Sequence, residues 1–202
     1  ASTINGGTLK IAYNHNTTGV GIFYDGGTVT NNTVIQHTGK NLVNILSKGA
    51  NLTNTANQTV QENSLGIYAN GGEVTNSGTL TLAGEKSVGF YLNNGAKLNA
   101  IGTITGSAAT NYKVGIYAKN GSIEEKGTYN FAIDNGVAMH LDDNGVNNFT
   151  GTLNMAGNST SGRAVGIYTT ASTTARNINT NINLSGKNAI GMLLSGDGTN
   201  GS

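Results

Sequence analysis

The fold is best predicted from VGIYAKNG at residues 114–121, because copies of this stretch recur along the whole chain. The other strong copies are GVGIFYDGG from Gly19, SLGIYANGG from Ser64, SVGFYLNNG from Ser87 and AVGIYTTAS from Ala164. The weaker copies are LVNILSKGA from Leu42, GVAMHLDDNG from Gly136 and AIGMLLSGDG from Ala189. The residues at the central small position lie 22 to 28 apart, and they are Gly21, Asn44, Gly66, Gly89, Gly115, Ala138, Gly166 and Gly191. Such a period indicates a repeat architecture.

Each repeat holds two further short extended segments. The second segment carries one apolar residue eight or nine positions after the small position, and these residues are Val29, Leu52, Val74, Leu98 and Ile123. The third segment follows a glycine, as in GTLTLAG from Gly78 and GTLNMAG from Gly151. Its apolar and polar residues alternate, which is typical of a β-strand. Three short strands and three corners therefore make up each repeat.

This repeat predicts an all-β fold, a single-stranded parallel β-helix of about eight coils with three short strands per coil. We expect it to be right-handed, as parallel crossovers generally are. Antiparallel hairpins do not fit, because the same strand returns in the same direction each time. Residues 1–202 are expected to form a single repeat segment. Because residues 196–202 stop partway through a repeat, we also expect the segment to belong to a longer protein.

Alternation within VGIYA predicts which columns of side chains face the core. The first and third positions are apolar in every copy and are expected to point inward. The residues at the first position are Val20, Val43, Leu65, Val88, Val114, Val137, Val165 and Ile190. The residues at the third position are Ile22, Ile45, Ile67, Phe90, Ile116, Met139, Ile167 and Met192. The small column and the next column are then expected to face outward. The second of these reads Phe23, Leu46, Tyr68, Tyr91, Tyr117, His140, Tyr168 and Leu193.

Composition excludes several kinds of protein. The 202 residues are 36% hydrophobic and only 10% charged, and the net charge of +1 does not favour nucleic acid or an anionic membrane as a partner. The 31 glycines without proline or a three-residue period exclude collagen. The absence of cysteine excludes disulfides and thiolate metal sites. The first ten residues, ASTINGGTLK, lack the basic and apolar regions of a signal peptide, and the sequence has no run of 18 apolar residues.

Motifs for cofactors and metals give no convincing match, so we predict no cofactor and no metal site. Residues 196–201 fit the spacing GxGxxG, but a corner turn explains them better because no helix follows. His15, His37 and His140 are far apart in the sequence and lack a repeated acidic partner. No calcium-binding loop or zinc-protease motif occurs.

Acidic residues near the fifth and sixth copies were weighed as a catalytic pair, because glycoside hydrolysis needs two carboxylates across a groove. Asp142 and Asp143 lie at a predicted corner with Lys119 one coil earlier, and Glu124 and Glu125 lie on a preceding second strand. The sequence DDNG is also an ordinary turn. We favour the turn, and we expect neither hydrolase nor lyase activity.

The outward aromatic column is the strongest candidate for a contact surface. Tyrosine offers a large apolar face and a hydroxyl at low entropic cost, which suits binding as well as stacking between coils. His140 is expected to interrupt its apolar stripe. Extra residues between the third strand and the next VGIY strand, at 106–112 and 159–163, add two more candidates, since insertions in solenoids form loops on one side. The candidate contact residues are Tyr68, Tyr91, Tyr117, His140, Tyr168, Tyr112 and Arg163.

The VGIY-x-x-NG repeat, with its following x-V-T-N and G-T-L-T segments, resembles the passenger domains of type V autotransporters, and most of all the large surface adhesins of fusobacteria. The resemblance covers about residues 18–194. It implies export to the bacterial cell surface, anchoring by a C-terminal barrel outside this chain, and attachment to host cells or other bacteria. Asn44, Ala138 and residues 170–172 depart from the repeat pattern.

We therefore expect an extracellular bacterial adhesin segment, a stiff stalk that is monomeric and has a contact face for glycan or protein. The partner would be a surface protein or glycan of a host cell or a bacterium, not a nucleic acid. Two alternatives stay open, a β-helical enzyme that cleaves polysaccharide and a structural protein like a phage fibre. A convergent acid–base cluster would favour the enzyme, and trimerisation or polymerisation would favour the fibre.

Overall fold

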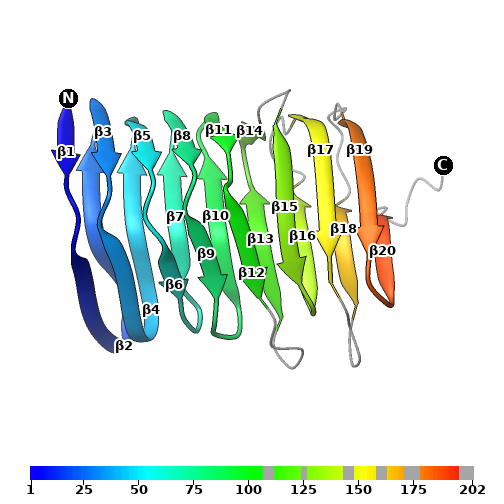
Figure 1. The fold of residues 1–202 in the computed structure, drawn as a ribbon, viewed down its shortest axis with the longest axis horizontal. Coiled ribbons are helices and arrows are strands. Elements are labelled where there is room, and N and C mark those ends of the chain that lie inside the picture. Colours follow the sequence, from blue (N-terminus) through cyan, green and yellow to red (C-terminus); the bar gives the residue numbers. More distant parts are fainter. Residues whose placement is uncertain (107–111, 124–126, 143–147, 158–162, 171–177, 196–202) are drawn as a thin grey trace.

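The computed structural model describes residues 1–106, 112–123, 127–142, 148–157, 163–170 and 178–195. All regular elements in these ranges are β-strands, and every strand pair is parallel. Figure 1 shows the coils side by side along a rod, from β1 (Ser2–Ile4) at one end to β20 (Ala189–Leu194) at the other. The predicted parallel β-helix is thus confirmed. The described part of the chain contains no helix that is long and apolar enough to cross a membrane.

Each turn of the rod contributes one strand to each of three faces. The VGIY face is formed by the second halves of β2 (Thr8–Asp25) and β4 (Val34–Lys48), then β7 (Leu65–Asn70), β10 (Ser87–Asn93), β13 (Lys113–Ala118), β16 (Gly136–Leu141), β18 (Ala164–Thr169) and β20. These strands span about seven turns, where the sequence predicted about eight coils.

The other two faces are built from shorter strands. The second face contains β1, β3 (Thr28–Asn31), β5 (Asn51–Asn54), β8 (Glu73–Asn76), β11 (Ala96–Ala100) and β14 (Gly121–Ile123). The third face contains the first halves of β2 and β4, then β6 (Gln58–Val60), β9 (Thr79–Leu82), β12 (Thr103–Gly106) and β15 (Thr128–Ile133). Strands β17 (Asn148–Ala156) and β19 (Ile178–Ser185) run through both of these faces.

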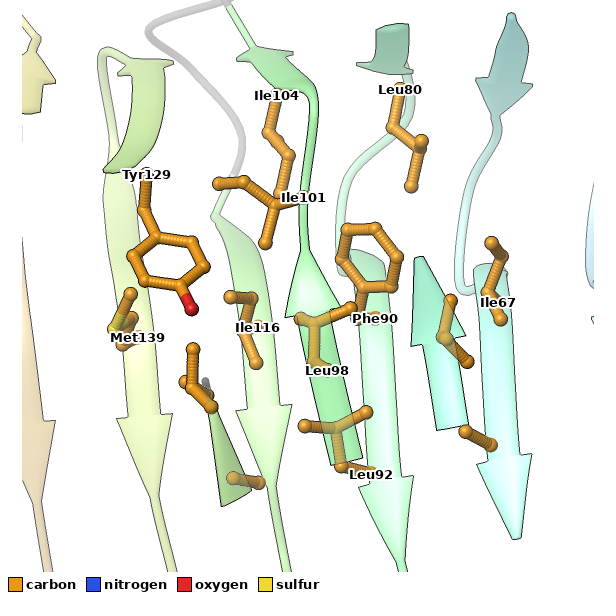
Figure 2. Packing of buried hydrophobic residues seen from close by; sticks show 14 of the residues in the cluster. Ile67, Leu80, Phe90, Leu92, Leu98, Ile101, Ile104, Ile116, Tyr129 and Met139 are labelled. Carbon is orange, nitrogen blue, oxygen red and sulfur yellow. The ribbon is translucent and has the colours of Figure 1, made fainter. Parts of the chain in front are cut away.

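The core is a set of apolar columns in which each residue packs on its counterpart one coil away. Ile67, Phe90 and Ile116 form successive rungs of the third VGIYA position, and all three are fully buried. Figure 2 shows them with Leu80 and Ile104 from the third face filling the centre of the rod. Burying one such side chain stabilises a fold by about 1.5–3 kcal/mol. The predicted inward position of this column is confirmed, and the apolar column on the second face is buried as well.

The prediction for the first VGIYA position is wrong, because this column faces outward. Val20 is 45% exposed, and Leu65 and Val88 are partly exposed, although they were expected in the core. Val43, Val114, Val137 and Val165 are buried but lie outside the core cluster. The whole misassigned column is Val20, Val43, Leu65, Val88, Val114, Val137, Val165 and Ile190.

The small column, predicted to face outward, faces the core instead. A Cβ atom on Gly66 would lie 2.6 Å from the Gly89 carbonyl oxygen and 2.8 Å from Cδ2 of the core residue Leu80. Ala138, which replaces glycine in this column, belongs to the core and is fully buried. Two consecutive positions therefore point inward, and the strand bends between them. The strand pairing skips the glycine on every rung while the register is kept, so the bend repeats from coil to coil.

Asparagine side chains stack inside one corner of the rod. Asn31, Asn54 and Asn76 are buried, and the amide of each of the first two donates to the side-chain oxygen of the next, at 2.7 and 2.6 Å. The Asn76 amide ends this asparagine ladder by donating to the Ile101 carbonyl oxygen at 2.6 Å. Each amide also donates to a backbone carbonyl two residues ahead. The corner is thereby closed without unpaired amide donors on these three side chains.

The last coil lacks a neighbour on its outer side within the described residues. Its core-facing residues are consequently exposed, with Leu184 at 43% and Met192 at 39%. Strand β20 pairs only with β18 among the described strands. Among the described residues, this end of the rod therefore presents apolar side chains and backbone groups that no other strand pairs.

Candidate functional site

An unbroken column of five rings runs along the outside of the VGIY face, and we call it the aromatic rib. Its members are Tyr68, Tyr91, Tyr117, His140 and Tyr168, which follow one another on successive rungs. All five side chains are partly exposed. The predicted outward position and register of this column are therefore confirmed. Phe23 and Leu46 precede the rib and Leu193 follows it in the same register.

Neighbouring rings of the rib touch along its whole length. The ring centroids are 4.8 Å apart for Tyr68 and Tyr91 and 5.1 Å apart for Tyr91 and Tyr117, which are stacked nearly parallel. His140 lies 4.6 Å from Tyr117 and 4.8 Å from Tyr168. His140, which was expected to interrupt the apolar stripe, does not break the column of rings, because its flat imidazole packs between two tyrosines.

One hydroxyl group of the rib, that of Tyr117, is held by a carboxylate at the next corner. The Tyr117 hydroxyl donates to Oδ2 of Asp142. Burial raises the pKa of Tyr91, and the nearby Tyr68 and Asp142 raise this pKa further. The Tyr91 phenol therefore stays protonated and can donate a hydrogen bond to a partner.

Only some of the acidic residues considered as a catalytic pair lie within the described residues. Asp142 contacts the rib as described, and Lys119 occupies the same column one coil earlier. Asp143, Glu124 and Glu125 lie outside the described residues. Asp142 therefore has an observed role, which is to position the Tyr117 hydroxyl.

A groove of about 420 Å³ lies beside the far end of the rib. Its lining combines residues of the misassigned valine column, the end of the rib and the corner before the VGIY face. The lining residues are Tyr112, Asn135, Gly136, Val137, Arg163, Val165, Tyr168 and Leu193. The volume lies within the range of ordinary small-molecule sites, about 300–1,000 Å³.

Three polar residues of the groove occupy successive rungs of the same corner, and we call them the edge column. They are Tyr112, Asn135 and Arg163, and each directly precedes a strand residue that pairs with its counterpart in the next coil. The backbone N–H of Lys113 donates to the Asn135 carbonyl at 3.2 Å, and that of Gly136 donates to the Arg163 carbonyl at 3.0 Å. The corner thus fixes their spacing at about one coil rise, roughly 4.8 Å.

The edge column brings a cation and an aromatic ring to the groove. Arg163 is exposed, and it forms no ion pair with a residue that the structure describes. Tyr112 is 50% exposed, yet burial of its hydroxyl end raises its pKa, and Tyr168 raises it further. The Tyr112 hydroxyl therefore stays protonated and remains a hydrogen-bond donor.

A lysine is buried next to the groove, and sequence reasoning missed it. Lys113 is fully buried and pairs with the groove residue Gly136. Burial lowers the pKa of its ammonium group, while Asp134 acts in the opposite direction. The sequence position of Lys113 could have indicated its burial, because it stands directly before the VGIY segment, where Ser64 and Ser87 are buried in earlier coils.

The remaining candidates do not assemble into a site. His37 is buried with its Nε2 2.9 Å from the Tyr13 carbonyl oxygen, and His15 packs on the Tyr13 ring at 4.9 Å. Residues 196–201 lie outside the described residues. Across the described ranges, no three His, Asp or Glu side chains are arranged to hold a metal ion.

Sequence reasoning placed Tyr112, Arg163 and Tyr168 among the contact candidates, and the structure brings these three together around one groove. It missed Val137 and Val165 because the valine column had been assigned to the core, and it also missed Asn135. The repeat spacing could have shown that the edge column lies together, because Tyr112, Asn135 and Arg163 each stand three residues before the small position of their repeat.

Comparisons with known proteins add no identification. No family model matches the chain, and no curated protein or solved structure is significantly similar to it.

Proposed function

We propose that this chain is a segment of an extracellular bacterial surface adhesin, a stiff β-helical stalk that carries a contact face for a glycan or a protein. The observation that carries the proposal is the aromatic rib, five touching rings that remain partly exposed along one face of the rod. A ladder serving only to fill space would be covered, as the buried pair Tyr129 and Phe149 is.

The rib suits binding because its rings are fixed before a partner arrives. Each ring is held by its rung and by its neighbours, so little side-chain entropy is lost on contact. One exposed tyrosine contributes on the order of 1 kcal/mol to a partner, so useful affinity requires several rings at once. In a straight column of evenly spaced rings, an extended ligand can contact several rings at once.

Partner and location follow from chemistry and resemblance together. The rib is uncharged apart from His140, and the chain has a net charge of only +1, so a glycan or protein suits it better than a nucleic acid. The resemblance of the VGIY repeats to autotransporter passengers supports display on the outside of a bacterium.

The proposal is tested by changing Tyr91 and Tyr117 together to Ser. Adhesion of the protein to cells and to a glycan array should weaken about tenfold or more, since two central rings are lost. The control is the double change of Asn130 and Asn154 to Ser, which removes exposed rungs from the third face. Thermal unfolding of both variants reports whether the fold is intact.

Unchanged adhesion per folded molecule in the tyrosine variant would refute the contact face. A loss of adhesion in the asparagine control as large as that in the tyrosine variant would also count against it, because the rib would then not be the binding surface. Complete absence of adhesion by the unchanged protein would refute the adhesin proposal itself.

A further inference from the structure

The groove differs from the rest of the contact face because it adds a positive charge to aromatic and apolar surface. Arg163 supplies the charge, Tyr112 and Tyr168 supply rings, and Val137 and Val165 supply apolar lining. No described residue neutralises the guanidinium through an ion pair. A ligand that fits the groove should therefore carry an anionic group next to a flat apolar surface.

A carboxylate matches the charged part of the groove. The guanidinium presents paired N–H donors that bind both oxygens of a carboxylate at once. The Tyr112 hydroxyl, kept protonated by burial and by Tyr168, adds a neutral donor in the same groove. The edge column fixes Tyr112 and Arg163 two rungs apart on one corner, with Asn135 between them.

A sugar ring matches the remaining lining. Its C–H face packs on aromatic and aliphatic side chains, and its hydroxyls exchange hydrogen bonds with phenols and with the Asn135 amide. An extended peptide matches less well, because strand addition needs free backbone groups. Strand β16 already pairs with β13 and β18, and β18 already pairs with β16 and β20.

We propose that this groove is a subsite for a carboxylate-bearing sugar, a uronic or sialic acid unit, in which Arg163 binds the carboxylate. The inference rests on the proposed contact face and names the ligand class of one part of it. The adjoining rib would hold neighbouring neutral sugars of the same chain.

The test measures binding of the folded chain to four soluble probes. These are a galacturonic acid trisaccharide, its methyl ester, a sialylated lactose and a short polyglutamate peptide. The ester keeps the shape of the first probe and removes its charge. The two acidic sugars distinguish a uronic from a sialic source. Titration calorimetry at low and at physiological salt gives the affinities.

The variants are Arg163→Gln and Arg163→Lys, with Lys48→Gln as the control. Lys48 is exposed and lies at the opposite edge of the VGIY face, and its change removes the same charge. Loss of a charge-assisted hydrogen bond should weaken binding of at least one acidic sugar about tenfold in Arg163→Gln. Arg163→Lys should show a smaller loss, because it keeps the charge and loses the paired donors.

The inference would be overturned if the unchanged protein bound neither acidic sugar, or if it and Arg163→Gln bound the acidic sugars equally. It would also be overturned if the galacturonic acid probe and its ester bound equally while the sialylated lactose did not bind, or if polyglutamate alone bound. Adhesion to cells that persists without any binding of the acidic sugars would overturn this inference and leave the adhesin proposal standing. Binding of an acidic sugar through Arg163 without adhesion to cells would support this inference and count against the adhesin proposal.

Discussion

Single residues of one strand differ sharply in what they contribute, because the bend at the small position decides which side chains reach the core. Ile67 and Ile116 are fully buried and contact core residues of neighbouring coils, whereas Val88 two residues before Phe90 is partly exposed. We expect Ile67→Ala or Ile116→Ala to lower the free energy of unfolding by about 2–5 kcal/mol. Chemical denaturation measures this loss.

Val88→Ala is the matched control for this prediction. It removes a β-branched side chain from the same face of the rod, but from the outward column, and should cost less than about 1 kcal/mol. A loss for Val88→Ala equal to that of the isoleucine variants would mean that the two columns had been assigned to the wrong sides.

Alternation alone could place the isoleucine and tyrosine columns, and it failed for valine and glycine. From Ile67 to Tyr68 to Ala69 the side chains alternate strictly, so the outward rib followed from the core. At Gly66 the phase shifts by one residue, because an absent side chain lets the carbonyl of Gly89 approach. An apolar column of valines looks the same in a sequence whether it faces a core or lines an outer groove.

At the level of the element, the corners hold the three faces in register. The asparagine ladder does this on the N-terminal side, where Asn54 both accepts from Asn31 and donates to Asn76. In the next coil the Asn76 amide meets the Ile101 carbonyl oxygen instead of another asparagine side chain, and the Ile101 side chain is fully buried in the core. The polar stacking of this ladder thus ends at that coil.

We predict that Asn54→Ala lowers the free energy of unfolding by about 1–3 kcal/mol, because it leaves buried amide groups of its neighbours without their partners. Urea denaturation followed by circular dichroism measures the change. The control is Asn154→Ala, in the exposed ladder that joins Asn130, Asn154 and Asn183. That change should stay within about 0.5 kcal/mol. Equal losses would show that burial of the ladder adds nothing.

Only part of the groove lining could be predicted from the sequence. Tyr112 and Arg163 are predicted as contact residues because the length of the repeat varies near them, and this variation can be read from the sequence. Their meeting around one cavity depends on how each corner is closed by backbone hydrogen bonds, which length variation does not reveal. The outward valines, which complete the lining, were hidden by the reversed assignment of their column.

On the scale of the whole molecule, we expect the end of the rod at β20 to govern association. Leu184 and Met192 are exposed there, beside backbone groups of β20 that no described strand pairs. Unpaired strand edges are templates for another chain. We therefore predict that this 202-residue chain is monomeric when dilute and associates end to end as its concentration rises. Sedimentation velocity distinguishes such elongated species from compact ones.

The control for association is the double change of Leu184 and Met192 to Lys. Inward-pointing charges at an edge disfavour pairing, so the variant should remain monomeric at concentrations where the unchanged chain associates. A compact dimer that persists in this variant would show that the sides of the rod, and not its end, form the contact.

The parallel pairing also determines how the rod responds to a pulling force. Backbone hydrogen bonds join each coil to the next, so they run along the rod, and tension on the last strand loads the bonds of one coil before those of any other. Each coil that detaches frees 22 to 28 residues, which is roughly 70–100 Å of extended chain. A tether of this kind lengthens in many short steps of similar size, and it dissipates mechanical work gradually instead of failing at once.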